Sequence, residues 1–185
     1  MASQGPNSPN AATSSGGTAF WSFSPTHVKT SNNSYATISL ADVDECGELR
    51  ATDFGFTIPA GATIDGIIVD VERNGGTDVI DYCKLMKGGV TQITEKGGSA
   101  LSGTDTIQSF GGASDLWSNT WSYSDINASN FGVAYTVVTT NMVSADANVD
   151  HITVTVHYTA STGGRCIQRR KMNQVVFDQP AEKHW

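Results

Sequence analysis

Histidine and cysteine are the side chains best suited to chemistry near neutral pH, and their spacing argues against a shared site. His151 and His157 stand six residues apart in an alternating segment. An extended strand would place them on one face but about 20 Å apart, at roughly 3.3 Å per residue. That separation is too great for one metal ion. No Gly-x-Ser-x-Gly segment supplies an elbow for a serine nucleophile, so we expect no catalytic triad.

The cysteines lead to the same conclusion. Cys46, Cys83 and Cys166 cannot all pair within the chain, and none stands in Cys-x-x-Cys spacing. Zinc binding and thioredoxin-like redox chemistry both rely on such spacing. We therefore expect free thiols, no cofactor, no metal site and no enzymatic activity.

Carboxylates gather in one loop, where Asp42, Asp44, Glu45 and Glu48 lie within seven residues. Two interpretations stay open: a solvated loop, which we favour, and a Ca²⁺ site, because calcium prefers oxygen ligands. The loop lacks the spacing and the glycine of an EF-hand. Asp125 follows Ser124 in a segment typical of a capped helical turn, so we predict a structural role for its carboxylate rather than glycosidase chemistry.

Aromatic residues cluster in and near the segment 115–121. Trp117 and Trp121 stand four apart, which on a strand places them on one face. Together with Trp21 and Tyr123 they could form a platform on which sugar rings stack. Tryptophans of an all-β domain more often fill the core or an interface, and we favour that interpretation.

Charge divides the chain into two unequal parts. Residues 1–160 contain six basic and sixteen acidic residues, a net charge of −10, whereas residues 161–185 contain five basic and two acidic ones, a net charge of +3. An acidic body is unsuited to nucleic acid, because phosphate contacts need lysine and arginine. No apolar run approaches the 18 residues of a membrane-spanning helix. We expect neither nucleic acid nor membrane as a partner.

The segment 161–185 is predicted to contact protein partners. Arg165, Arg169, Arg170 and Lys171 form a basic cluster. This cluster could also be solvated or touch nucleic acid, but an acidic protein surface is its best electrostatic partner. A short apolar run and a final tryptophan add apolar contact area. The candidate contact residues are Arg165, Arg169, Arg170, Lys171, Phe177 and Trp185.

Alternating apolar and polar residues between Phe20 and residue 160 predict a domain of eight or nine strands. Nineteen glycines and frequent turn signals separate these segments, which favours an all-β, two-sheet β-sandwich of the jelly-roll type. Residues 1–19 contain no charged residue and are rich in Gly, Ser, Pro and Asn, so we expect a flexible, extended arm. The predicted organisation is an arm (1–19), a sandwich (20–160) and a tail (161–185). The predicted strands are 35–40, 49–58 with an interruption at Gly55, 64–73, 79–87, 90–95, 106–110, 115–121, 131–140 and 149–159.

Several segments also carry a resemblance when taken together: SNNSYATISL, LRATDFGFTIPAGATIDGIIVDVER, DLWSNTWSYSDINASNFGVAY and VDHITVTVHYT. Over roughly residues 5–159 the chain resembles a family of β-sandwich structural proteins of tailed-phage virions. The resemblance implies a non-enzymatic virion protein, in particular a capsid decoration or cement protein bound to the major capsid protein. It also implies a homo-oligomer, for example a trimer, and synthesis in the host cytoplasm.

Two alternatives to capsid decoration stay open at this point. The first is a virion component associated with the neck, tail or fibres. The second is a carbohydrate-binding β-sandwich module that would use exposed tryptophan and tyrosine side chains.

Overall fold

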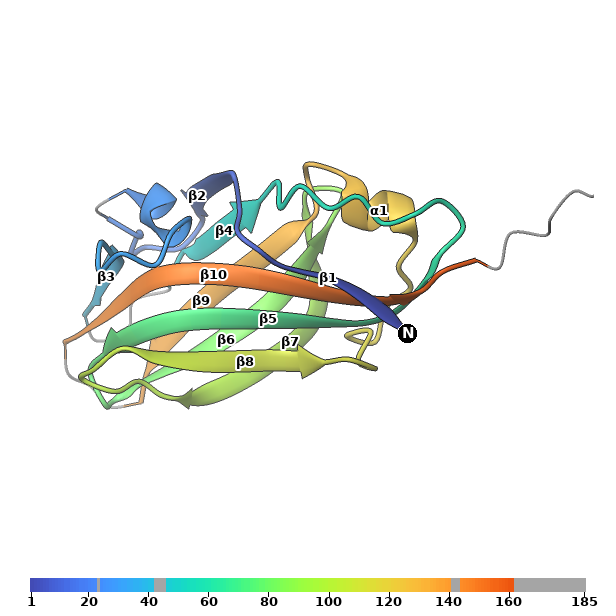
Figure 1. Cartoon of the computed structure of the whole chain (residues 1–185). Helices are drawn as coiled ribbons and strands as arrows, with labels where there is room; N and C mark the ends of the chain where they lie inside the picture. The colour runs from blue at the N-terminus through green and yellow to red at the C-terminus, as the bar shows by residue number, and fades with distance from the viewer. Residues whose placement is uncertain (23, 42–45, 141–143, 162–185) are drawn as a thin grey trace, which may run out of the picture.

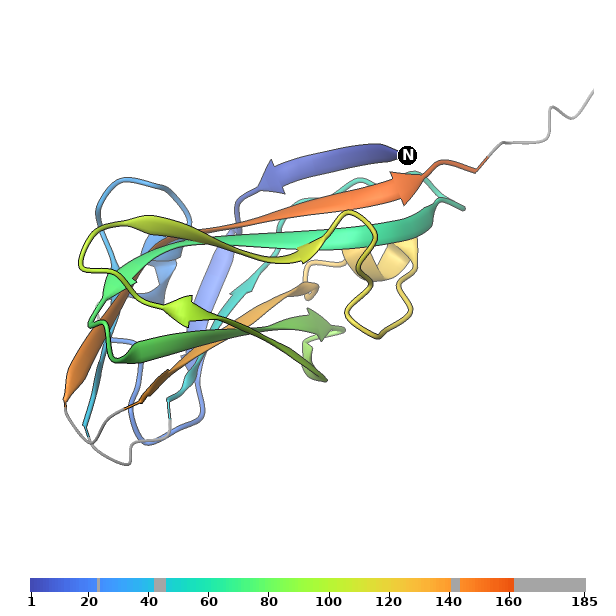
Figure 2. The same cartoon turned by 90° about the horizontal axis from the view of Figure 1, so that it is seen from below.

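The protein is a sandwich of two antiparallel sheets, which the computed structural model describes for residues 1–22, 24–41, 46–140 and 144–161 (Figure 1). Figure 2 shows the two layers edge-on. Sheet A contains β1 (Ala2–Asn7), β3 (Ala36–Leu40), β5 (Thr63–Gly75), β8 (Thr106–Gly112) and β10 (Ala145–Thr159). Sheet B contains β2 (Ala11–Ser15), β4 (Glu48–Thr52), β6 (Val79–Lys87), β7 (Val90–Ala100) and β9 (Gly132–Thr139).

The connectivity of the eight strands from β3 to β10 is that of a jelly roll. In sheet A the order is β3-β10-β5-β8, and in sheet B it is β4-β9-β6-β7. The chain therefore passes from one sheet to the other at most of its connections and forms two interlocked Greek keys. The predicted fold class, an all-β two-sheet sandwich, is confirmed.

The first 19 residues differ from the flexible arm that their composition predicts. Strand β1 pairs with β10, and β2 pairs with β4, so one N-terminal strand extends each sheet. Backbone hydrogen bonds hold both strands, and Ala12 and Ala19 are buried against the core. Composition misses this because an edge strand needs a free backbone partner more than an apolar side-chain pattern.

Most predicted strands are confirmed, with shifted ends. β6 has the predicted bounds, β5 and β7 are longer than predicted, and β4 ends at Thr52 well before the predicted Ile58. The prediction of a strand at residues 115–121 is wrong. This segment is irregular, and Trp117 has a φ of 56°. Both of its tryptophans are nevertheless buried.

A single helical turn, α1 (Tyr123–Asn127), follows this segment as predicted, but Ser122 rather than Ser124 caps it. The Ser122 hydroxyl accepts a hydrogen bond from the Asp125 backbone N–H, and the Asp125 carboxylate accepts one from the Ser122 N–H. This reciprocal arrangement is a capping box. The structural role predicted for the Asp125 carboxylate is therefore confirmed.

The core lies between the sheets and is closed at one end by aromatic rings. Phe131 makes edge-on contacts with Phe54, Phe56 and Trp121, with ring centres 5.6–6.2 Å apart. Aromatic pairs in this geometry add to the free energy gained by burial. A short 3₁₀ helix, η1 (Pro25–Val28), covers part of the opposite end and buries Val28.

Candidate interaction surface

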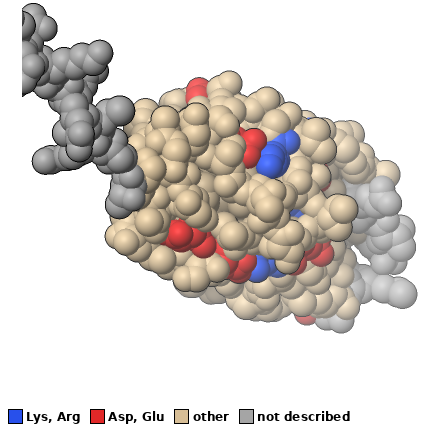
Figure 3. Space-filling model, turned by 90° about the vertical axis from the view of Figure 1, so that its right-hand side faces the viewer, with Lys and Arg blue, Asp and Glu red and all other residues tan. Residues whose placement is uncertain are grey.

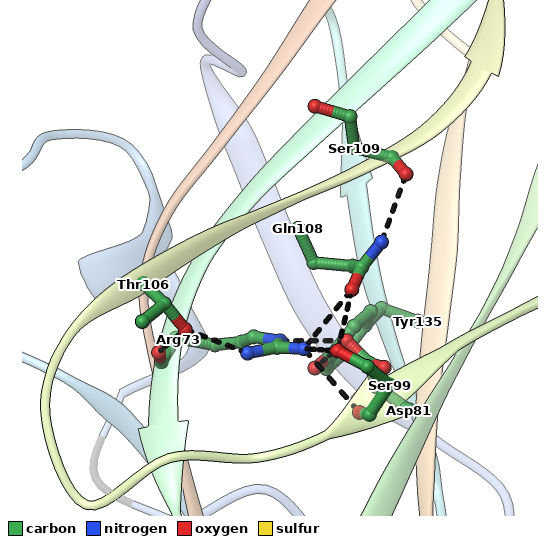
Figure 4. A network of polar contacts seen from close by, with 7 residues as sticks. All are labelled: Arg73, Asp81, Ser99, Thr106, Gln108, Ser109 and Tyr135. Atoms are coloured by element: carbon green, nitrogen blue, oxygen red, sulfur yellow. Dashed lines mark hydrogen bonds and ion pairs between the residues drawn. The ribbon is translucent and has the colours of Figure 1, made fainter.

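A network of polar side chains is centred on the buried Arg73 and extends to the surface at Ser99 and Thr106 (Figure 4). Arg73 of β5 donates from Nε to Oδ2 of Asp81 on β6 over 2.8 Å, which joins sheet A to sheet B. The Tyr135 hydroxyl donates to the same oxygen over 3.1 Å. The remaining guanidinium hydrogens bond Thr106, Ser99 and Gln108.

This network is structural rather than catalytic. Arg73 is 2 % exposed, and Asp81 and Tyr135 are fully buried, so no substrate reaches them. Burial, followed by the charge of Asp81, raises the pKa of Tyr135 well above its usual value. The phenol therefore stays protonated and acts as a hydrogen-bond donor to the carboxylate.

The described thiols are poor nucleophiles. Burial raises the pKa of Cys46 to about 11, and burial together with the Asp81 charge raises the pKa of Cys83 well above its ordinary value. A thiol reacts as its thiolate, which these values suppress at neutral pH. Cys166 lies outside the described residues.

One serine–histidine contact occurs on the outer face of sheet A. Ser8 Oγ lies 2.8 Å from Nε2 of His151, and no carboxylate orients the other ring nitrogen within the described residues. Burial lowers the pKa of His151, and the negative charges of Glu72 and Asp150 partly offset this decrease. The carboxylate of Asp150 is itself buried and accepts hydrogen bonds from the backbone N–H groups of residues 32 and 33. A nucleophile–base pair without an orienting group is weak support for hydrolysis.

The three described tryptophans fill the core, as favoured by the sequence, and do not form an exposed sugar platform. Trp21, Trp117 and Trp121 are 3 %, 2 % and 8 % exposed, and each indole N–H donates to a backbone carbonyl. Tyr123 is partly buried against the same core. Phe20 is an aromatic residue that is exposed in the described part of the chain, with 61 % of its surface accessible.

The described surface is hollowed on sheet A and at one end of the sandwich. An open groove of about 510 Å³ lies where β5 ends and β10 begins, and its polar lining includes Asp78 and Asp146. A hollow of about 40 Å³ on the outer face of sheet A lies among Asp70, Glu72 and His151. No three His, Cys, Asp or Glu side chains of the described residues are placed to hold a metal ion.

The basic side chains of the sandwich are almost all held by carboxylates. Lys84 pairs with Glu95 and Lys96 with Asp115, while Lys87 lies 3.1 Å from an oxygen of Asp125. Arg50 and Arg73 also have carboxylate partners. In the end-on view of Figure 3 the larger blue groups adjoin red ones on a mostly uncharged surface.

The outer face of sheet A differs, because its carboxylates lack basic partners among the described residues. We call four of them the carboxylate row: Asp65, Asp70, Glu72 and Asp105. The first three lie along β5 and have neutral neighbours or His151 beside them, such as the hydroxyls of Thr159 and Ser109. Asp105 continues the row, since it accepts a hydrogen bond from the Asn74 amide over 2.6 Å.

Asp105 also accepts a hydrogen bond from the Tyr35 hydroxyl, and this bond, followed by burial and the carboxylate charge, raises the pKa of Tyr35 to about 12. Lys29 lies at the margin of the face, where its backbone bridges to His151. The carboxylate row is therefore a strip of negative charge that the sandwich itself leaves largely uncompensated.

The predicted contact residues lie outside the described part of the chain. These residues are Arg165, Arg169, Arg170, Lys171, Phe177 and Trp185. Residues 42–45 of the acidic loop, for which a solvated loop and a Ca²⁺ site stayed open, also lie outside it. The last member of the acidic loop, Glu48, is described and pairs with Arg50 at 2.6 Å. In the described segments no helix is both long and apolar enough to cross a membrane.

No protein-family model and no curated protein sequence match the chain. Among solved structures, the chain is similar to the structure of TmCBM61 in complex with β-1,4-galactotriose. That match has 11 % sequence identity and a TM-score of 0.42, and it covers 80 % of this chain and 93 % of the other. A similarity at this level carries no argument about a ligand.

Proposed function

We propose that this protein is a non-enzymatic structural protein of a tailed-phage virion, and specifically a capsid decoration protein that binds the major capsid protein. The observation that supports this proposal best is the division of charge. The sandwich uses its own basic groups in ion pairs, presents the carboxylate row on one face, and continues into a basic segment. Complementary charge of this kind guides and orients the association of proteins.

The internal organisation of the sandwich supports binding rather than catalysis. The described ionisable groups with shifted pKa values are explained by burial or by structural hydrogen bonds, such as those of Tyr135 and Asp125. A rigid two-sheet scaffold that repeats on a lattice gains avidity from many weak contacts. The homo-oligomeric state, a trimer for example, belongs to the same proposal.

Binding to particles tests the proposal directly. Purified full-length protein and a variant that ends at residue 161 are added to capsids lacking the protein, and the bound fraction is measured after sedimentation. We expect hundreds of copies per particle for the full chain and a clear loss for the truncated chain. Equal binding of both chains would refute the role of residues 162–185, and a few copies at one vertex would favour a neck or tail component.

A carbohydrate-binding module is the second candidate function. The hollow among Asp70, Glu72 and His151 offers carboxylate and imidazole groups of the kind that bind sugar hydroxyls. Its apolar wall is Ile107, which is 68 % exposed, and not an aromatic ring. Glycan-array binding that is lost in Glu72→Gln and kept in Glu95→Gln would favour this candidate over the virion proposal.

A further inference from the structure

The carboxylate row begins beside the end of β10. Thr159, the last residue of β10, pairs with Thr63 at the start of β5, and its hydroxyl donates to Asp65 over 2.8 Å. From that end β5 runs along the sheet past Asp70 and Glu72. A segment that leaves β10 and reverses its direction would therefore run along the row from its first member.

We infer that residues 162–185 dock on the outer face of sheet A of their own chain, with the basic cluster along the carboxylate row. This inference goes beyond the proposed function, because it concerns the free protein before any partner binds.

The β5 part of the carboxylate row and the basic cluster have similar lengths. From Asp65 to Glu72 β5 rises about 23 Å, and from Arg165 to Lys171 an extended chain spans about 20 Å, at roughly 3.3 Å per residue. Five residues, 160–164, separate the end of β10 from the first arginine, and two of them are glycines. Glycine adopts the backbone angles of a tight reversal without steric cost.

Charge favours this face over the outer face of sheet B. The outer side of sheet B carries the pairs Lys84–Glu95 and Arg50–Glu48, in which each carboxylate already has a cation. An arginine that docked there would have to displace an existing partner. On the carboxylate row it meets Asp70 and Glu72, whose described neighbours are a serine hydroxyl and an imidazole.

Tethering favours docking within one chain over docking between copies. Exposed ion pairs are weak one by one. A short connection makes their formation intramolecular, with an effective concentration that free copies reach only in very concentrated solution. The contact should also be sensitive to salt, since the screening length falls from about 10 Å at 0.1 M to about 3 Å at 1 M.

The test uses the full chain with a nitroxide label on Cys166, which lies within the basic cluster. Cys83 is fully buried, and Cys46, which is only partly buried, is replaced by serine so that Cys166 alone takes the label. The label should broaden the backbone amide signals of β5 and β8 in an NMR spectrum at 50 mM salt. The broadening should fall several-fold at 1 M salt and in the double variant Asp70→Asn/Glu72→Gln.

The matched control is Glu48→Gln/Glu95→Gln, which removes the same two charges from sheet B and should leave the broadening unchanged. A mixture of labelled protein with unlabelled ¹⁵N protein should show no broadening. Broadening in that mixture would assign the face to the segment of a second copy and overturn the intramolecular contact. Absence of broadening on sheet A, or broadening insensitive to both salt and the Asp70/Glu72 variant, would overturn the inference altogether.

Discussion

Arg73 and Asp81 form an ion pair across the core, with Nε and Oδ2 2.8 Å apart and with side chains that are 3 % and 0 % exposed. Removal of one partner leaves the other charge buried, which typically costs about 3–5 kcal/mol. We therefore expect Asp81→Ala to lower the free energy of unfolding by about that amount in urea denaturation. Tyr135 loses its acceptor in the same variant.

The double variant Arg73→Met/Asp81→Leu is the control for this prediction. Replacement of a buried pair by apolar residues of similar size is often neutral or stabilising, so most of the loss should be recovered. An Asp81→Ala protein that unfolds within about 1 kcal/mol of the original would show that the pair does not hold the sheets together.

Gly98 on β7 leaves room for the same carboxylate. A Cβ at this position would collide with Oδ1 of Asp81, and Arg73 and Tyr135 hold that side chain in place. Gly98→Ala should therefore destabilise the protein by about 1–3 kcal/mol, as overpacking does. At the neighbouring Gly97 a Cβ would meet only the Tyr82 ring at 3.4 Å, so Gly97→Ala should keep nearly full stability when both variants are compared by urea denaturation.

The capping box of α1 gives a third test. Ser122→Ala removes the hydroxyl that accepts from the Asp125 N–H and should cost about 1 kcal/mol in urea denaturation. Ser124→Ala changes an exposed residue whose hydroxyl hydrogen-bonds the Ser122 hydroxyl, and it should stay within about 0.5 kcal/mol of the original. A larger effect at Ser124 would restore the cap predicted from the sequence.

The sequence predicted the central strands well because each buries one face and so alternates strictly. Ile67, Val69 and Val71 of β5 are fully buried, as their spacing indicates. The sequence does not predict the N-terminal strands, because their side chains carry no such pattern and backbone pairing with β10 and β4 places them. The spacing of Trp117 and Trp121 predicts a strand, but spacing alone does not distinguish a strand from an irregular loop that buries the same residues.

The carboxylate row could be predicted only in part. Asp70 and Glu72 alternate along a strand, so a shared outward face follows from the sequence. Whether a cation lies beside these two carboxylates depends on which strands become neighbours. The approach of Asp105 to Asn74 depends on the same strand pairing. Residues far apart in the sequence determine both.

Lys96 and Asp115 form an ion pair, with Nζ and Oδ2 2.6 Å apart. Burial alone would raise the pKa of Asp115, but hydrogen bonds from Lys96 and the Trp117 N–H outweigh it and hold that pKa below its usual value. The carboxylate therefore contributes stability that is present above its unfolded pKa of about 3.9 and is lost as the pH falls through the lower folded value. Lys96→Met should raise the pKa of Asp115 in an NMR titration and weaken this pH dependence. Lys84→Met removes an equal charge next to Glu95, so a comparable rise in that variant would assign the effect to general charge and not to the contact.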